Sequence, residues 1–367
     1  MTSAERIPFA DLRPGPDHAL VAQAIDRVVA RGWFVLGPEV EGFEHEFAAA
    51  CGAAHAVGVG NGTDAIALVL RALDLGPGDE VIVPAMTAAF TGLAVTMVGA
   101  TPVVVDVEPD TLTMDPAACA AAVSPRTRAI VPVHLYGQPA DGAAVAAVAA
   151  RHGLALVEDC CQAHLATDAG VPIGTRGAAG AFSFYPTKNL GALGDGGAVV
   201  TNDEALATRI RRLRNGGQSA RYQHVEPGVN SRLDEVQAAV LRARLPGLAQ
   251  ATATRRGLAA EYRRRLARGA APVPERDAGH VYHLFPVRSP YRDALRTHLD
   301  ERGIETLVHY PVPLSAQPAF ERYGNRPCPV ADRAATELLS LPLYPRLSTD
   351  HVARVADAVN EFEERTL

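Results

Sequence analysis

Lys188 lies in a glycine-rich loop that follows a predicted buried strand, within the segment FSFYPTKNLGALGDGGAVVT. Open α/β sheets bind ligands beyond the carboxyl ends of their strands, which is where this loop begins. A lysine forms a Schiff base only as a neutral amine, and burial and nearby cations lower its pKa toward that state. The chain is very poor in lysine relative to arginine, and the loop is packed with small residues. The pattern therefore indicates an amine placed for covalent chemistry rather than a solvated surface charge.

Asp159 directly follows another predicted strand, LALVE, and opens the turn DCCQAH. A carboxylate there could face the ring nitrogen of pyridoxal 5′-phosphate (PLP) and hold a proton on it, which the cofactor needs to act as an electron sink. It could equally cap the helical turn that follows. Position alone leaves both interpretations open. The neighbouring Glu158 should point to the opposite face of the strand.

A phosphate site is indicated by the segment GNGTD at 60–64, between the strand HAVGV and the helix AIALVLRAL. Glycine permits close backbone approach, and the exposed N–H groups of a helix N-terminus attract phosphate. Ser183, on the strand before Lys188, could add a hydroxyl to the same phosphate. The segment is neither a Walker loop nor a GxGxxG fingerprint, so a dinucleotide is not favoured.

No metal site is predicted. The histidines, among them His134, His164 and His309, show no HExxH or paired spacing. The cysteines are scattered, and the adjacent pair Cys160–Cys161 would alternate to opposite sides of an extended chain. We expect free thiols in a reducing cytoplasm. No GxSxG motif supports a serine hydrolase.

Alternating apolar strands and helical stretches position these residues. Seven short runs, rich in valine and isoleucine, are typical of strands buried on both faces of a mostly parallel sheet. They are 55–59, 80–83, 102–106, 128–133, 154–158, 180–184 and 197–201. Helices are predicted at 63–73, 87–98, 115–123, 141–151 and 202–214. This alternation predicts an α/β fold covered by helices on both sides.

The remainder of the chain predicts a smaller α+β domain. A polar, glycine-containing loop at 215–231 is followed by a helix with Ser231 as its N-cap, interrupted at 246–247 and continuing to about residue 266. Strands at 281–288 and 304–309 and helices at 291–302 and 349–364 complete it. We expect an N-terminal segment at 1–20, a large domain at 21–245 and a small domain at 246–367.

Composition excludes some classes of partner. The 367 residues carry a formal net charge of −6, without the basic excess of a nucleic-acid-binding protein. No apolar run is long enough to span a bilayer, and the N-terminus lacks the apolar core of a secretory signal. We expect a cytoplasmic protein.

Ten segments in order resemble the DegT/DnrJ/EryC1/StrS sugar aminotransferases, which are fold-type I PLP enzymes, nearly from end to end. They are GWFVLGPEVEGFEHEFA, VGNGTDAIALVLRAL, GPGDEVIVPA, GATPVVVDVEPDTLTMDP, AIVPVHLYGQPAD, LVEDCCQAH, FSFYPTKNLGALGDGGAVVT, LRNGG, GVNSRLDEVQAAVL and RGIETLVHYPVP. The resemblance implies a large PLP-binding domain with a mostly parallel seven-stranded sheet and a smaller C-terminal domain. It also implies that the cofactor passes through pyridoxamine 5′-phosphate during the reaction.

The resemblance implies a role for each matching residue. Lys188 would form the Schiff base and shuttle a proton, and Asp159 would face the pyridine nitrogen. Gln162 would lie near the cofactor's 3′ oxygen. The expected cofactor contacts are Gly62, Thr63, Asp64, Phe90, Asp159, Gln162, Ser183, Lys188 and Asn230. Thr63 and Asp64 would bind phosphate through backbone N–H groups, and Asn230 would reach it from the neighbouring subunit of an obligate homodimer with composite sites.

The sequence departs from the family pattern at three places. Ala88 stands where an aromatic residue commonly stacks on the PLP ring, so Phe90 could substitute from nearby. Leu165 replaces the glycine of the QAHG motif, after His164. Ser315 replaces a common histidine in the segment that follows Tyr310.

The resemblance implies a nucleotide-linked keto sugar as acceptor and L-glutamate as amino donor. We expect dTDP-4-keto-6-deoxyglucose, with a 3-keto sugar or a keto-cyclitol as alternatives, and the alanine- and arginine-rich composition suits natural-product or surface-glycan biosynthesis. His164, Arg232 and Tyr310 are candidates for substrate binding, as is Arg214. A related dehydratase is disfavoured because such enzymes carry histidine at the position of Lys188. A non-catalytic regulatory protein is disfavoured because Lys188, Asp159 and Ser183 are all present.

Overall fold

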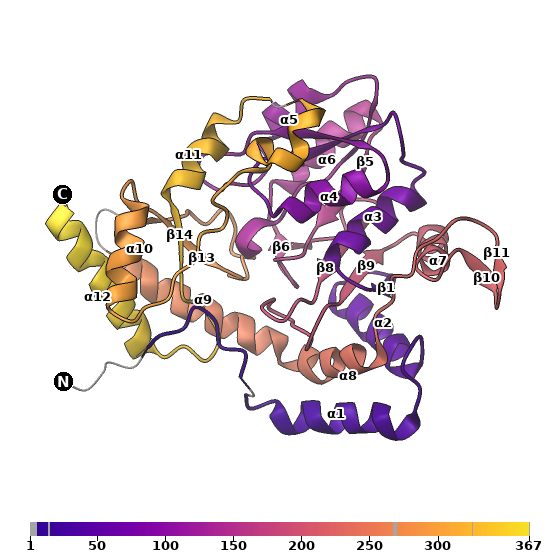
Figure 1. Cartoon of the computed structure of the whole chain (residues 1–367), viewed down its shortest axis with the longest axis horizontal. Coiled ribbons are helices and arrows are strands. Elements are labelled where there is room, and N and C mark those ends of the chain that lie inside the picture. The colour runs from indigo at the N-terminus through magenta and orange to yellow at the C-terminus, as the bar shows by residue number, and fades with distance from the viewer. Residues whose placement is uncertain (1–5, 14, 267–269, 325, 367) are drawn as a thin grey trace.

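A single seven-stranded sheet organises the larger part of the molecule, as a computed structural model of residues 6–13, 15–266, 270–324 and 326–366 shows (Figure 1). Its strands are β1 (His55–Val59), β2 (Glu80–Pro84), β3 (Thr101–Val105), β4 (Thr127–Ile130), β5 (Ala155–Asp159), β8 (Ala179–Ser183) and β9 (Gly197–Thr201). They lie in the order β1-β9-β8-β5-β4-β2-β3. Strand β9 runs opposite to the other six strands, which are parallel to one another. The predicted fold class is therefore confirmed.

Twelve α-helices surround this sheet and a smaller one within the described residues. They are α1 (His18–Arg31), α2 (Pro38–Ala50), α3 (Gly62–Ala72), α4 (Ala89–Met97), α5 (Pro116–Ala122), α6 (Gly142–His152), α7 (Glu204–Leu213), α8 (Glu235–Arg244), α9 (Leu248–Arg265), α10 (Arg292–Glu301), α11 (Pro329–Glu337) and α12 (Thr349–Thr366). None of these helices is long and apolar enough to cross a membrane.

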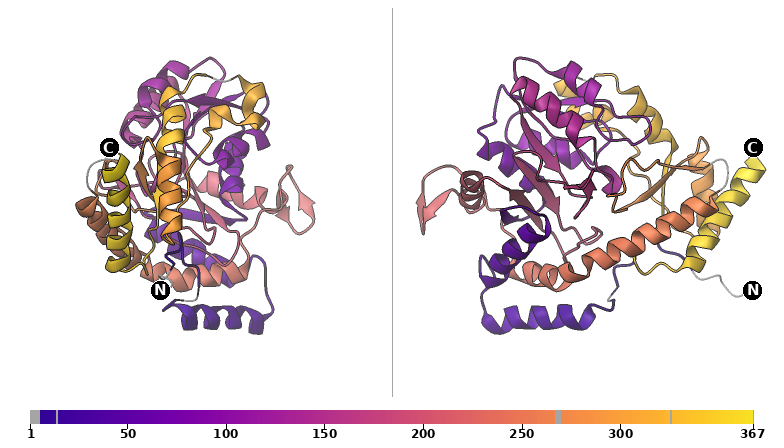
Figure 2. Two further views of the ribbon diagram at one scale, coloured as in Figure 1. Left: turned by 60° about the vertical axis from the view of Figure 1, so that its left-hand side comes forward. Right: turned by 180° about the vertical axis from the view of Figure 1, so that it is seen from behind.

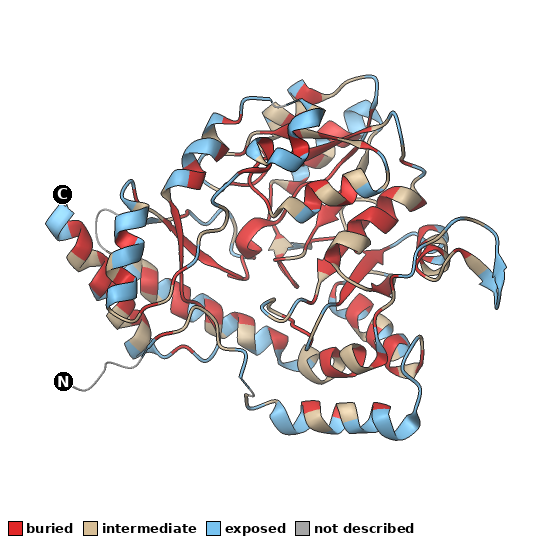
Figure 3. Ribbon diagram, viewed as in Figure 1, coloured by how far each residue is buried: buried red, intermediate tan, exposed pale blue. Residues whose placement is uncertain are grey.

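The strands are apolar on both faces because helices cover both faces (Figure 3). On one side Val81 and Val83 belong to the core that contains α3, α4 and α7. On the other side Ile82 packs with α5 and α6, and Val200 packs with α2 and α8. Successive residues of a strand point to opposite faces, so a strand buried on both sides reads as a continuous apolar run.

The loops that follow β1, β5 and β8 leave the sheet at the same edge. Strands β5 and β8 are parallel, with Asp159 paired to Ala181. Because β9 is antiparallel to both β8 and β1, these two strands are parallel to each other. The sheet therefore brings the segment 60–64, the turn after Asp159 and the loop of Lys188 to one edge, although they lie far apart in sequence.

The C-terminal third forms a second, smaller layer. The strands β12 (Ala271–Pro272), β13 (Phe285–Arg288) and β14 (Leu338–Leu341) pack with α9, α10 and α12. The predicted strand at 281–288 is shorter than expected, and the one at 304–309 does not form: only single bridges, at Ile304 and Leu307, replace it. Helix α11 and strand β14 were not predicted. The proposed domain limits remain predictions.

The segment 215–231 is not the structureless loop that its composition predicted. It contains a two-stranded hairpin of β10 (Gln218–Ala220) and β11 (Gln223–His224), which stands away from the body of the protein in both views of Figure 2. Gly216 and Gly217 precede it with φ of 73° and 75°, a backbone conformation that glycine adopts without strain. The short strands β6 (Thr167–Asp168) and β7 (Val171–Pro172) form another hairpin. The described residues also contain four 3₁₀ turns: η1 (Leu135–Gly137), η2 (Leu245–Gly247), η3 (Leu314–Ala316) and η4 (Pro318–Tyr323).

We predicted that Ser231 caps the following helix. This is wrong, because α8 begins only at Glu235. The Glu235 side chain instead caps a different helix. Its carboxylate accepts hydrogen bonds from the N–H groups of Gly37, Glu39 and Val40, at 2.8–2.9 Å, at the start of α2. The first N–H groups of a helix have no partner within the helix, so this buried carboxylate satisfies donors that would otherwise be orphaned.

We predict that Glu235→Ala destabilises the protein by about 3 kcal/mol, because it leaves three buried N–H groups without acceptors. The free energy of unfolding in urea measures this. The control is Glu301→Ala at the exposed end of α10, which should change stability by less than about 0.5 kcal/mol. Equal stabilities of the two variants would contradict the capping role.

Candidate active site

Lys188 and Asp159 lie together at the edge of the sheet. The backbone N–H of Lys188 donates to the Tyr185 carbonyl at 2.8 Å, which closes a turn just after β8. Burial lowers the pKa of the Lys188 amine, and its electrostatic interactions with Cys161 and Asp159 oppose that shift. Lys188 is the only lysine in the 367-residue sequence. The amine therefore lies within electrostatic range of the Asp159 carboxylate, and burial favours the neutral form that nucleophilic attack requires.

Two hydrogen bonds orient the Asp159 carboxylate. Its Oδ1 accepts from the N–H of Cys161 at 3.1 Å, which is the local turn contact that the sequence left open. Its Oδ2 accepts from the hydroxyl of Thr91 at 2.8 Å. The side chain is thus a buried carboxylate held from both sides, and one of its two bonds is the contact that caps the following turn.

A tight cradle forms where α3 begins. A Cβ atom placed on Gly62 would lie 2.6 Å from Sγ of Cys161 and 2.8 Å from Cβ of Ser183, so only glycine fits there. The N–H groups of Gly62 and Thr63 have no acceptor among the described residues. The N–H of Asp64, by contrast, donates to the side chain of Asn61 at 2.9 Å. The structure therefore offers the first two amides to an anion, whereas we had predicted Thr63 and Asp64.

The Asp64 side chain supports this cradle from behind. Its Oδ2 accepts a hydrogen bond from the Ser231 hydroxyl at 2.6 Å, and that hydroxyl in turn accepts from the N–H of Gly60 at 3.0 Å. Ser231 therefore joins the segment 60–64 to the chain entering α8. The two residues of this contact are 167 positions apart, so local sequence patterns do not predict it.

Gln162 and Tyr310 form a second pair of neighbours. Oε1 of Gln162 accepts from the N–H of Tyr136 at 2.7 Å, and its Nε2 donates to the Tyr310 hydroxyl oxygen at 2.8 Å. Burial raises the pKa of Tyr310, and its electrostatic interactions with Asp159 and Cys161 act in the same direction. Tyr310 therefore belongs to the same site as Asp159, and one Gln162 amide hydrogen remains for a ligand.

His164 does not fit the predicted substrate contact. Its side chain is fully buried beneath β8, against the rings of Phe182 and Phe184. Its Nε2 donates to the Ser183 carbonyl at 2.9 Å, and its Nδ1 has no partner among the described residues. Burial and the Lys188 charge lower the pKa of His164 to about 3, so it is neutral. We interpret it as a support for the end of β8.

Four other candidates, Phe90, Asn230, Arg232 and Arg214, have the following surroundings in the single chain. Phe90 is 63% exposed in the first turn of α4. Asn230 is exposed and forms an isolated bridge with Asn215, whose side chain accepts from Arg232 at 3.1 Å. Their roles stay predictions, and the role of Asn230 involves a second subunit. Arg214 is buried against Glu44 and the Gly58 carbonyl, so it is a structural residue.

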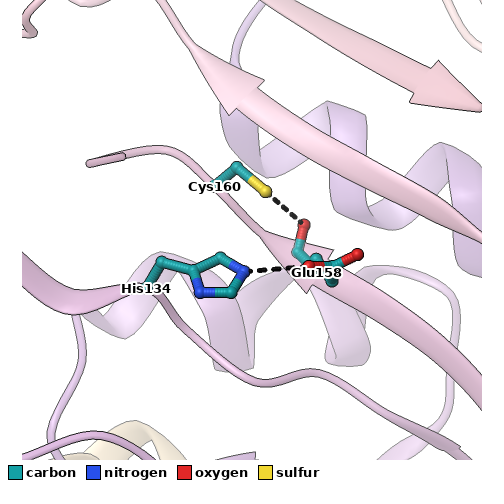
Figure 4. A group of neighbouring side chains, drawn as sticks. All are labelled: His134, Glu158 and Cys160. Carbon is teal, nitrogen blue, oxygen red and sulfur yellow. Dashed lines mark hydrogen bonds and ion pairs between the residues drawn. The ribbon is translucent and has the colours of Figure 1, made fainter. Parts of the chain in front are cut away.

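On the opposite face of β5, His134, Glu158 and Cys160 gather in the arrangement that Figure 4 shows. Nδ1 of His134 accepts from the N–H of Ala140 at 3.1 Å, so its Nε2 carries the hydrogen that bonds to Oε2 of Glu158 at 3.1 Å. Oε1 of Glu158 accepts from the N–H groups of Arg176 and Gly177. Burial is the strongest single influence on the pKa of Glu158 and would raise it, but the interactions with His134 and the backbone N–H groups together outweigh burial and lower that pKa. Because these donors and acceptors are already paired, the group fixes the strand and does not suit a metal ion.

The residues at the sheet edge fit PLP. The glycine cradle and two uncommitted amides suit a phosphate. The buried Asp159 suits a ring nitrogen, and Lys188 suits an aldehyde. Fold and site thus define a PLP-dependent enzyme built on an α/β sheet.

Comparison with known proteins agrees with this class. Residues 17–360 match the model of the DegT/DnrJ/EryC1/StrS aminotransferase family, whose enzymes use PLP. The chain belongs to this family. It is a PLP-dependent sugar aminotransferase.

Similar proteins cover the whole length. The chain is 52% identical to a dTDP-3-amino-3,4,6-trideoxy-α-D-glucose transaminase of Streptomyces venezuelae, over 98% of this chain and 97% of the relative. It is 45% identical to a UDP-N-acetyl-3-dehydro-α-D-glucosamine 3-aminotransferase of Acidithiobacillus ferrooxidans, over 98% of both chains. The crystal structure of S. venezuelae DesV in complex with a ketimine intermediate superposes with a TM-score of 0.96 at 51% identity, covering 99% of this chain and all of that one.

We predict that Gly62→Ala weakens PLP binding about tenfold or more, equivalent to at least ~1.4 kcal/mol, because the added methyl group displaces Cys161 or Ser183 from the cradle. Titration of the apoprotein with PLP, followed by protein fluorescence, measures the dissociation constant. Gly257→Ala is the matched control, since a Cβ at this position in α9 meets nothing within 4 Å. Wild-type affinity in the Gly62 variant would show that the cradle does not bind the cofactor.

Proposed function

We propose that this protein transfers an amino group from L-glutamate to the C3 keto group of a nucleotide-diphospho deoxy sugar, giving an amino sugar for natural-product or surface-glycan biosynthesis. The two transaminases compared above are named for sugars whose amino or keto group is at C3. Of the ring positions considered from the sequence, they favour the 3-keto alternative over a 4-keto sugar. The observation that carries the assignment is the position of Lys188 and Asp159 at the same edge of the sheet, beside the glycine cradle at Gly62.

PLP, when bound, supplies a ring that withdraws electrons from the carbon bearing the amino group. The neutral amine of Lys188 is placed to take a proton from the α-carbon of glutamate and, in the second half of the reaction, to deliver one to C3 of the sugar. Burial supports this role because a permanently charged ammonium group could not accept the proton. The Asp159 carboxylate would hold the proton of the ring nitrogen by a charge-assisted hydrogen bond.

The remaining residues bind and orient. The N–H groups of Gly62 and Thr63 and the hydroxyl of Ser183 would bind phosphate at the positive end of α3. The free amide hydrogen of Gln162 would point to the cofactor's 3′ oxygen, and Tyr310 would line the space that the substrates enter.

We further propose a homodimer with composite active sites. Asn230 would reach the partner's phosphate, and Phe90 would complete the ring-stacking position that Ala88 leaves small. The support is that several large apolar side chains are half exposed or more in the single chain, where a partner subunit would cover them. Among them are Trp33, Phe34, Phe90, Tyr185 and Leu193.

A panel of keto-sugar nucleotides, each incubated with PLP enzyme and L-glutamate, tests the function. For a 3-keto sugar we expect a mass increase of about 1 Da, because the carbonyl oxygen is replaced by an amino group and a hydrogen on the same carbon. The product's NMR spectrum locates the new amine. Lys188→Ala should lose turnover with every sugar, by a factor of at least ~10³. Amination at C4 only, or none with any sugar nucleotide, would overturn the proposal.

We predict complementation between two inactive variants. A dimer that combines a Lys188→Ala chain with an Asn230→Ala chain holds one site with both native residues if Asn230 serves the partner's site. Mixing and re-equilibrating the two proteins should therefore restore up to about a quarter of the wild-type activity, the result of random pairing and one intact site in each mixed dimer. Activity that never exceeds that of the separate variants would place Asn230 within its own subunit's site or outside any site.

A further inference from the structure

We infer that Thr91, with Thr87 behind it, is a positioning residue that sets the orientation of the Asp159 carboxylate toward the cofactor ring. The hydroxyl of Thr91 donates to Oδ2 of Asp159 at 2.8 Å, and the hydroxyls of Thr87 and Thr91 are 2.9 Å apart. The inference concerns the cofactor and does not depend on which sugar the enzyme uses.

The direction of this hydrogen-bond chain follows from the number of hydrogens available. An ionised carboxylate only accepts, so the single hydroxyl hydrogen of Thr91 is used by Asp159. The Thr91 oxygen can then only accept from Thr87, whose hydrogen must point toward it. Two hydroxyl dipoles are therefore aligned in series toward the carboxylate, an arrangement in which each bond strengthens the other.

Burial makes the alignment costly to lose. Thr87, Thr91 and Asp159 are 3%, 1% and 5% exposed. Water cannot readily replace a missing hydroxyl at this depth, so the carboxylate oxygen would lose a partner outright. With Oδ1 fixed by the N–H of Cys161 and Oδ2 by Thr91, the carboxylate plane has one preferred rotation. Without Thr91 only the bond to Cys161 remains, and the plane can turn about it.

The contact is not an ordinary helix contact. A threonine within a helix often returns its hydroxyl to a carbonyl one turn earlier. Thr96, later in the same helix, does so: it donates to the Leu93 carbonyl at 2.8 Å. Thr91 instead reaches another element of the fold, 68 residues away in sequence. Helix α4 therefore presents this hydroxyl to the end of β5 rather than to itself.

The test measures the bound cofactor rather than turnover. Thr91→Val keeps the shape of the side chain and removes the hydroxyl. We expect the dissociation constant of PLP to rise about tenfold, and the pH midpoint of the cofactor's visible absorption to shift, while the melting temperature changes by only a few degrees. Thr91→Ser should restore both cofactor properties. Thr96→Val, the same substitution on the same helix, should leave both at wild-type values.

Wild-type PLP affinity and an unshifted midpoint in Thr91→Val would overturn the inference. So would equal defects in Thr91→Val and Thr91→Ser, since packing rather than the hydroxyl would then be responsible. If the Thr91→Val protein fails to fold, Thr87→Val provides the test. We expect a smaller shift of the absorption midpoint in the same direction, and an unshifted midpoint would contradict the proposed hydrogen-bond chain. Because no sugar is added, these results stand even if the proposed acceptor is wrong.

Discussion

The structure depends on the burial of one amine opposite one carboxylate at the edge of a sheet. Removing either charge from water is unfavourable, and the protein offsets this cost differently for Lys188 and for Asp159. Burial lowers the pKa of Lys188 toward neutrality, while Asp159 keeps hydrogen-bond donors on both oxygens. The surrounding fold brings these two groups to the same edge of the sheet and gives each a different environment.

Strand β5 divides its polar residues between its two faces. Glu158 points to one side, where His134 and two backbone N–H groups satisfy it and tie the strand to the following loop. Asp159 points to the other, where Thr91 and the cofactor edge lie. One buried carboxylate thus fixes the backbone on which the next carboxylate is oriented. Their opposite orientations are a direct consequence of the alternation of side chains along a strand.

The large sheet was predictable because each of its strands is a short apolar run, and helices cover both faces. The loops of Lys188, Asp159 and Gly62 were predictable for the same reason, since they follow strand ends. Contacts between distant segments were not: Thr91 with Asp159, and Ser231 with Asp64, leave no local signal. The C-terminal layer was predicted less well because its strands are short and several single bridges replace regular pairing.

The solitary lysine has a practical meaning for the life of the enzyme. Cyanate, acyl phosphates and reducing sugars modify ε-amino groups, and in most proteins surface lysines absorb that damage harmlessly. Here arginine supplies every other fixed side-chain cation, and guanidinium groups are far less nucleophilic because they stay protonated. An acylating or glycating reagent that reaches the site therefore meets the one ε-amine on which catalysis depends. A bound coenzyme that occupies this amine protects it from the reagent.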